Sequence, residues 1–190
     1  MKHLSKLHLQ RLSMLLLIAF LSACGSSTIK MTEKASTAPT AAPTMEMYEV
    51  HHEGRIHIFY DRKLYNDFLS LGETPFRLTR IGAGPNGETV VFGLTKQDKK
   101  QPGKVAVINL YDGKIEAANN FYAELHSHGR IYVFNDYDDM KPVRQFGHPN
   151  LFYTEIGAGP KGETVVYVLN EETKKNRPDA LIARYKQHNS

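Results

Sequence analysis

The stretch IGAGPNGETVV at residues 81–91 returns as IGAGPKGETVV at residues 156–166, which is 75 residues later. The same offset pairs Gly54, Arg55 and Ile56 with identical residues at positions 129–131. Self-similarity at a fixed spacing indicates repeated supersecondary units. We therefore expect residues 46–116 to form one unit and residues 117–190 to form a second, pseudo-equivalent one.

The pattern of each copy predicts the order β-β-α-β-β-β. In the first copy, apolar alternation and turn residues favour a hairpin, a helix and three more strands, at residues 48–52, 55–60, 63–71, 76–81, 88–94 and 105–110. In the second copy, Pro142 weakens the helix at 138–146, and the last strand is expected at 180–185. The expected fold class is α+β, with two tandem units and antiparallel sheets.

Polarity suggests a register for the first hairpin. A three-residue loop at His52-Glu53-Gly54 would put Tyr48, Val50, Ile56 and Ile58 on one face and the polar residues on the other. A two-residue turn at Glu53-Gly54 would mix apolar and polar residues on each face. We expect the three-residue loop.

The N-terminus has the three parts of a secretory signal peptide. Lys2, Lys6 and Arg11 precede an apolar run at residues 14–21, which ends in small residues at 22–23. This run of roughly ten residues is too short to span a hydrocarbon core of ~30 Å. We expect residues 1–23 to be removed.

The segment Leu21-Ser22-Ala23-Cys24 resembles the lipobox of bacterial lipoproteins, here followed by a duplicated envelope domain. The resemblance implies that the Cys24 thiol carries diacylglycerol and that its amine is acylated, for example with palmitate. Because Gly25 and not aspartate follows, it also implies sorting to the outer membrane, facing the periplasm. Residues 24–45, rich in Ser, Thr, Ala and Pro, are then expected to be a flexible tether.

The composition is that of a globular protein, with 41% hydrophobic and 23% charged residues. Its single cysteine excludes an intramolecular disulfide framework and a multi-cysteine zinc site. Loss of the signal peptide lowers the formal charge from +4 to +1, so basicity does not indicate a nucleic-acid partner. The lysine runs at 99–100 and 174–177 are read as solvated loops, with contact to anionic lipid as the alternative.

Three polar residues of the first hairpin recur in the second copy. They form a candidate surface for a ligand or partner, or else simple cross-strand charge pairs: Glu49, His51, Arg55, Glu124, His126 and Arg130.

A metal site is a further hypothesis. In the expected register His51 and His57 share a face, and two neutral imidazoles could ligate zinc or copper. Two observations argue against a metal site. The position that corresponds to His57 in the second copy is Tyr132, and the positive charge of Arg55 lies nearby.

The motifs that suggest catalysis are weak. Gly82-Ala83-Gly84-Pro85-Asn86-Gly87 matches G-x-G-x-x-G, but a strand and not a helix follows, which favours a turn. Ser70 and Ser127 lack a nucleophile elbow, and the acids at 136, 138 and 139 are typical of a helix start. We assign no catalytic residue.

The sequence therefore predicts a lipid-anchored envelope protein that acts as a non-catalytic binding or scaffolding module. Its expected partners are the membrane, through the lipid on Cys24, and an envelope protein or cell-wall component. No cofactor other than that lipid is expected. The alternatives are a module that binds or senses a small molecule or metal ion and, less favoured, a hydrolase of envelope polymers.

Overall fold

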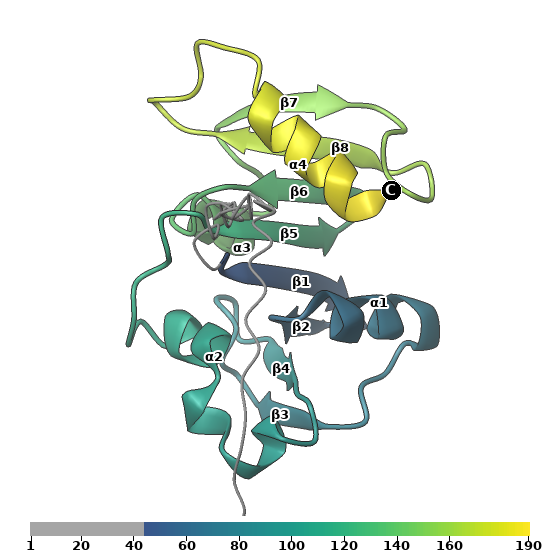
Figure 1. Cartoon of the computed structure of the whole chain (residues 1–190), viewed down its shortest axis with the longest axis vertical. Coiled ribbons are helices and arrows are strands. Elements are labelled where there is room, and N and C mark those ends of the chain that lie inside the picture. The colour runs from purple at the N-terminus through teal and green to yellow at the C-terminus, as the bar shows by residue number, and fades with distance from the viewer. Residues whose placement is uncertain (1–43) are drawn as a thin grey trace, which may run out of the picture. The chain divides into compact units, whose positions relative to one another are not determined.

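The computed structural model describes residues 44–190, which form one mixed β-sheet with helices on both faces (Figure 1). The expected signal peptide, Cys24 and most of the expected tether lie outside the described residues. The eight strands follow the order β3-β4-β2-β1-β5-β6-β8-β7.

The first half of the chain supplies four strands and two α-helices, joined by short 3₁₀ turns: β1 (Glu46–His52), β2 (Arg55–Phe59), α1 (Arg62–Leu71), β3 (Arg77–Arg80), β4 (Thr89–Gly93), η1 (Asp98–Lys100), η2 (Pro102–Lys104) and α2 (Ala106–Tyr111). The second half supplies β5 (Tyr122–Ser127), β6 (Arg130–Phe134), α3 (Met140–Phe146), β7 (Leu151–Glu155), β8 (Thr164–Leu169) and α4 (Asp179–Asn189).

The expectation of antiparallel sheets was wrong. The hairpins β1–β2, β3–β4, β5–β6 and β7–β8 are antiparallel, but β2–β4, β6–β8 and the central pair β1–β5 are parallel. Helix α1 connects β2 to the β3–β4 hairpin and so allows β4 to run parallel to β2.

Read outward from the central pair, both halves have the same strand order. Because β1 and β5 are parallel, the rotation axis that relates the two halves is parallel to the strands. Rotation about this axis exchanges the two faces of the sheet. The register of the β1–β5 pair is consistent with this exchange of faces, since Tyr48 lies beside Glu124 and Glu49 lies beside Leu125. Residues at corresponding positions of the two halves therefore lie on opposite faces.

The last element of each half is a helix, which corrects the expected strands at 105–110 and 180–185. Both runs are short and apolar, so periodicity alone does not distinguish strand from helix. In α4, Leu181, Ile182 and Tyr185 are buried at helical spacing, and α2 buries Val107, Ile108 and Leu110.

The hairpin turn also differs from the expected register. His52 pairs with Arg55, leaving a two-residue turn in which Glu53 and Gly54 both have positive φ, 50° and 70°. The expectation assumed that one face is solvated, whereas helices cover both faces. Val50 therefore lies opposite His57 on one side of the sheet, and Glu49 lies opposite Ile58 on the other.

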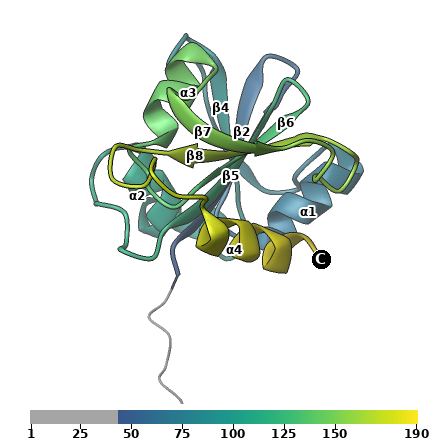
Figure 2. The same cartoon turned by 90° about the horizontal axis from the view of Figure 1, so that it is seen from above.

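Two hydrophobic cores lie on the two sides of the sheet. Helices α2 and α3 pack on one core, around Met47, Ile58 and Phe134, and we call this the α2/α3 face. Helices α1 and α4 pack on the other, around Tyr48 and Tyr167, and we call this the α1/α4 face. Figure 2 shows α1 and α4 on one side of the sheet and α3 on the other.

Candidate functional site

The structure does not bring the six residues of the predicted surface together. Glu49 and His51 lie on the α2/α3 face, whereas Arg55, opposite His52, lies on the α1/α4 face. In the second half, Glu124 and His126 lie on the α1/α4 face and Arg130 on the other. Both glutamates are fully buried, so they are not surface groups.

Glu49 is part of a buried ion pair. Its carboxylate accepts hydrogen bonds from Arg144 Nε of α3 at 2.7 Å and from His51 Nε2 at 2.8 Å. Burial disfavours the charged carboxylate, but the positive charge of Arg144 and the His51 hydrogen bond outweigh it and lower the pKa of Glu49. Glu49 is therefore held ionised by a helix from the other half of the chain.

Glu124 has a corresponding arrangement on the other face. Tyr122 and Asn189 donate to its Oε1 at 2.7 and 2.9 Å, Tyr65 donates to its Oε2 at 3.2 Å, and Arg62 lies 3.5 Å away. Burial raises the pKa of the carboxyl, but the His126 ring, 3.7 Å away, and the hydrogen bonds from Tyr122 and Asn189 outweigh it and lower the pKa. The donors come from both halves, so this network joins them.

His51 and His57 do not share a face, and the structure does not place them around one ion. His51 pairs with Ile56 across the hairpin, and His57 pairs with Val50. Within residues 44–190, no group of three or more His, Cys, Asp or Glu side chains is arranged to hold a metal ion. His57 instead stacks on Phe68 of α1, with ring centroids 4.4 Å apart.

The glycine motif at residues 82–87 forms a turn, as interpreted from the sequence. Gly82 and Gly87 have positive φ, and the Gly87 amide donates to the Gly84 carbonyl. Strand β4 follows. A phosphate-binding helix N-terminus is therefore not formed here.

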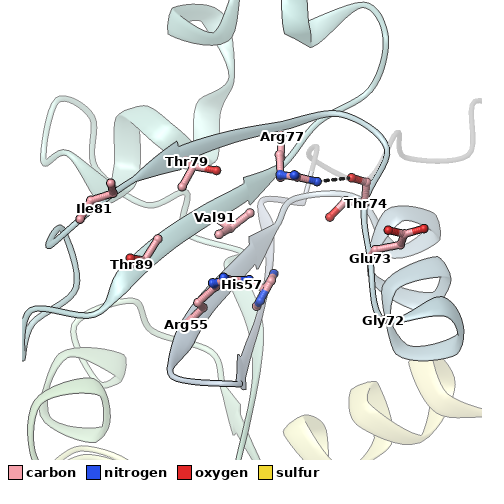
Figure 3. A pocket seen from close by; sticks show the side chains of 10 residues that line it. All are labelled: Arg55, His57, Gly72, Glu73, Thr74, Arg77, Thr79, Ile81, Thr89 and Val91. Atoms are coloured by element: carbon pink, nitrogen blue, oxygen red, sulfur yellow. Dashed lines mark hydrogen bonds between the residues drawn. The ribbon is translucent and has the colours of Figure 1, made fainter.

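A hollow of about 530 Å³ opens on the α1/α4 face, over strands β2, β4 and β3 (Figure 3). We call it the arginine hollow. Its side chains are those of Arg55, His57, Glu73, Thr74, Arg77, Thr79, Ile81, Thr89 and Val91, with Gly72 at the end of α1.

Strand register explains why these residues meet. Arg55 lies beside Thr89, and His57 lies beside Val91, across the parallel β2–β4 pair. Thr79 lies beside Val91 and Arg77 lies beside Gly93 across the antiparallel β3–β4 pair. The side chains of one sheet face therefore form the floor, with Arg55 and Arg77 at diagonal corners.

Gly93 of β4, which lies beside Arg77, has no side chain and so leaves room for the ring of Phe59. A Cβ at Gly93 would overlap the Phe59 ring, which lies across this position from β2. The close approach of Phe59 therefore requires glycine here.

Both arginines of the hollow are exposed and lack a carboxylate partner within residues 44–190. Arg77 donates only a long hydrogen bond, 3.4 Å, to the Thr74 carbonyl. Four other arginines of the described chain are paired with acids, namely Arg62, Arg80, Arg144 and Arg177. Two guanidinium groups therefore remain available to an anion.

His57 adds a polar but uncharged group. Burial, reinforced by the charges of His52 and Arg55, lowers the pKa of His57 to about 4, so its ring is neutral near pH 7. Its Nδ1 is buried and has no hydrogen-bond partner among the described residues. The positive charge of the hollow therefore comes from the two arginines.

The corresponding positions of the second half keep most of this floor but lose its charge pair. Arg130, Thr154, Ile156, Thr164 and Val166 repeat the residues found 75 positions earlier. Three positions of the sheet floor differ: Phe152 stands for Arg77, Tyr132 for His57 and Val168 for Gly93. The Tyr132 hydroxyl is used internally, because it donates to the Gly147 carbonyl at 3.1 Å.

Sequence reasoning found Arg55 but missed Arg77, Thr79 and Thr89. The missed signal was that Thr79, Ile81 and Thr89 recur 75 positions later as Thr154, Ile156 and Thr164, whereas Arg77 is replaced by Phe152.

Comparison of the chain with protein-family models, with curated proteins and with solved structures gives no match. Among the described residues, no helix has the length and apolar character needed to cross a membrane.

Proposed function

We propose that this protein is a lipid-anchored binding module of the cell envelope and that its arginine hollow takes a small anionic ligand. The anchor is Cys24, which the lipobox resemblance assigns. The observation that carries the ligand proposal is the unneutralised pair Arg55 and Arg77, which lines one hollow.

Guanidinium groups suit this role because their planar donors match the oxygens of a phosphate or carboxylate. The hydroxyls of Thr79 and Thr89 lie on the same floor and can hydrogen-bond the polar body of the ligand. A carboxylate, Glu73, stands at the rim and disfavours a second negative charge there. A single phosphate or carboxylate group on a small polar molecule fits this lining best.

We further infer that the two halves are tandem copies of one β-β-α-β-β-α unit. The repeated sequence and the matching strand order on either side of β1–β5 support this. The arginine hollow then represents a specialisation of the first copy, because the second copy has Phe152 where Arg77 stands.

The ligand proposal can be tested by thermal unfolding of the full chain with inorganic phosphate, glucuronate or neutral glucose. A ligand that binds only the folded state raises the unfolding temperature, by an amount equivalent to about 2.7 kcal/mol at 100 times its Kd. We expect an increase with an anion that is absent in Arg77→Phe and retained in Arg130→Ala. Equal effects in all three proteins would contradict a site at the arginine hollow.

The anchor can be tested separately by mass spectrometry of the N-terminal peptide and by cell fractionation. We expect Cys24→Ala to leave the membrane fraction and to lose the lipid mass. Retention of the variant in the membrane would contradict lipid anchoring through Cys24, without affecting the ligand proposal.

A further inference from the structure

A second group of polar side chains meets on the α2/α3 face, where the turns of the two central hairpins lie close together. Four residues line both of two adjoining hollows of about 250 and 280 Å³, namely His51, Glu88, Ser127 and His128. The arginine hollow does not include these residues. They come from β1, from the connection before β4, and from the end of β5 with its turn.

The buried Glu49 carboxylate determines how His51 presents its ring. Glu49 Oε1 accepts from His51 Nε2 at 2.8 Å, and Arg144 holds the other carboxylate oxygen. A neutral imidazole that donates from Nε2 carries its lone pair on Nδ1. His51 Nδ1 lies 3.4 Å from the Ser127 hydroxyl oxygen, so a base faces this hydroxyl.

Ser127 is held on its other side by His128. The Ser127 hydroxyl oxygen lies 2.8 Å from His128 Nδ1, and Ser127 itself is 9% exposed. His128 occupies the first position of the tight turn after β5 and has a positive φ of 52°, which is uncommon for a residue with a side chain. If His128 donates to the Ser127 oxygen, the Ser127 hydroxyl can donate to His51 Nδ1. Each of these three groups then has a hydrogen-bond partner.

We propose that Ser127 is the nucleophile of a covalent site for the acyl group of a small carboxylic ester, with His51 as its general base and Glu49 as the positioning residue. This proposal goes beyond the binding function above and uses none of the residues that line the arginine hollow. The order carboxylate, imidazole and hydroxyl is the arrangement that activates serine in acyl transfer.

The chemistry of the step is balanced by the residues present and by water. The Ser127 oxygen attacks the ester carbonyl while its proton passes to His51 Nδ1. The tetrahedral intermediate then breaks its bond to the alkoxide, which takes the proton from His51 and leaves as an alcohol. Water, deprotonated by His51, releases the carboxylic acid from acyl-Ser127 and restores the hydroxyl.

Ser70 provides a matched control. Ser70 lies on α1, is exposed, and donates its hydroxyl to the Asn66 carbonyl at 2.9 Å. Its hydroxyl is therefore bonded to the helix backbone and not to a histidine. A reagent that reacts with any exposed serine would therefore also label Ser70.

The test is labelling of the purified full chain with a fluorophosphonate probe, followed by peptide mapping, and hydrolysis of p-nitrophenyl acetate. We expect a single adduct on Ser127, at least a tenfold slower labelling in His51→Asn, and loss of both labelling and hydrolysis in Ser127→Ala. Ser70→Ala should behave as the unchanged protein.

Two results would overturn the proposal. One is an unchanged chain that gives no adduct, or an adduct elsewhere, because this result does not depend on the folding of any variant. The other is a Ser127→Ala variant that keeps the unfolding midpoint of the unchanged protein and hydrolyses the ester at the same rate.

Discussion

Arg144 Nε of α3 donates to Glu49 Oε2 of β1 at 2.7 Å, across 95 residues of sequence, and both groups are buried. On the opposite face, Arg62 of α1 lies 3.5 Å from Glu124 of β5. In each case the glutamate of a central strand is paired with a helix from the other half of the chain. These contacts make the two halves depend on one another for stability.

Removing one member of the Glu49–Arg144 pair leaves an uncompensated buried charge. We expect Arg144→Met to lower the free energy of unfolding by about 3–5 kcal/mol. The double variant Glu49→Met with Arg144→Leu should lose less, because no charge remains; Leu69 already occupies the position of α1 that corresponds to Arg144. Urea unfolding measures both values, and a double variant at least as unstable as the single one would contradict the prediction.

His57 should make stability depend on pH. Its pKa is about 4 in the folded protein against 6.5 for an ordinary histidine, so between these values the unfolded chain binds a proton that the folded chain does not. Stability is therefore lost as the pH falls below about 6.5, by up to about 3 kcal/mol near pH 4.

His57→Tyr, which copies the second half, removes this titration. Between pH 7 and pH 5 we expect the unchanged protein to lose about 2 kcal/mol more than the variant in urea unfolding. Parallel pH profiles for the two proteins would show that His57 is not the group responsible.

Because Gly93 lies against the Phe59 ring, even an alanine side chain at this position should lower the free energy of unfolding. Gly93→Ala places a Cβ less than 3.0 Å from Phe59 Cδ1, which is too close, and should destabilise the fold by about 1–3 kcal/mol. Gly103→Ala is the control, because its Cβ meets nothing within 4 Å and its φ is not positive. Its effect should stay within about 0.5 kcal/mol, and comparable losses in both variants would refute the packing argument.

The first hairpin turn offers a stabilising change. Glu53 has a positive φ of 50° in a turn that favours Asn or Gly at this position. Glu53→Asn should therefore increase the free energy of unfolding by up to about 1 kcal/mol, and Gly54→Ala should decrease it. His128 is the corresponding residue of the second turn, but its contact with Ser127 makes it unsuitable for this comparison.

Local patterns in the sequence predicted much of the fold. The helix expected at 63–71 is α1 at Arg62–Leu71, and the strands expected at 76–81 and 88–94 are β3 and β4 within one or two residues. Alternation, turn glycines and the Asp61 cap, whose side chain accepts from the Leu64 amide, are short-range signals. They do not depend on what the element packs against.

Apart from the two short apolar runs at 105–110 and 180–185, the wrong expectations concern packing between distant segments. The three-residue loop would make one face of the hairpin polar, but Glu49 and Glu124 are buried because Arg144 and Arg62 reach them from the opposite half. The parallel central pair β1–β5 likewise depends on a contact between residues about 75 positions apart. A strand pattern does not reveal which charge will neutralise its polar residues.

Contacts between distant strands also explain why the sequence does not group the residues of the two candidate sites. Arg55 was identified with Glu49 and His51, yet its neighbours in the hollow, Arg77 and Thr89, come from β3 and β4. No local motif marks Ser127, because its contact with His51 is made between strands. Both juxtapositions depend on strand order.

The central claim, an anion site at the arginine hollow, is tested most directly by isothermal titration of the full chain with inorganic phosphate and with glucuronate at low salt. We predict saturable binding of at least one of these anions with one site per chain, at least tenfold weaker in Arg77→Phe and unchanged in Arg130→Ala, whose residue occupies the corresponding corner of the second half. The response to the two anions separates phosphate from carboxylate ligands. Absence of saturable heat with both anions, or equal binding by Arg77→Phe, would contradict the account.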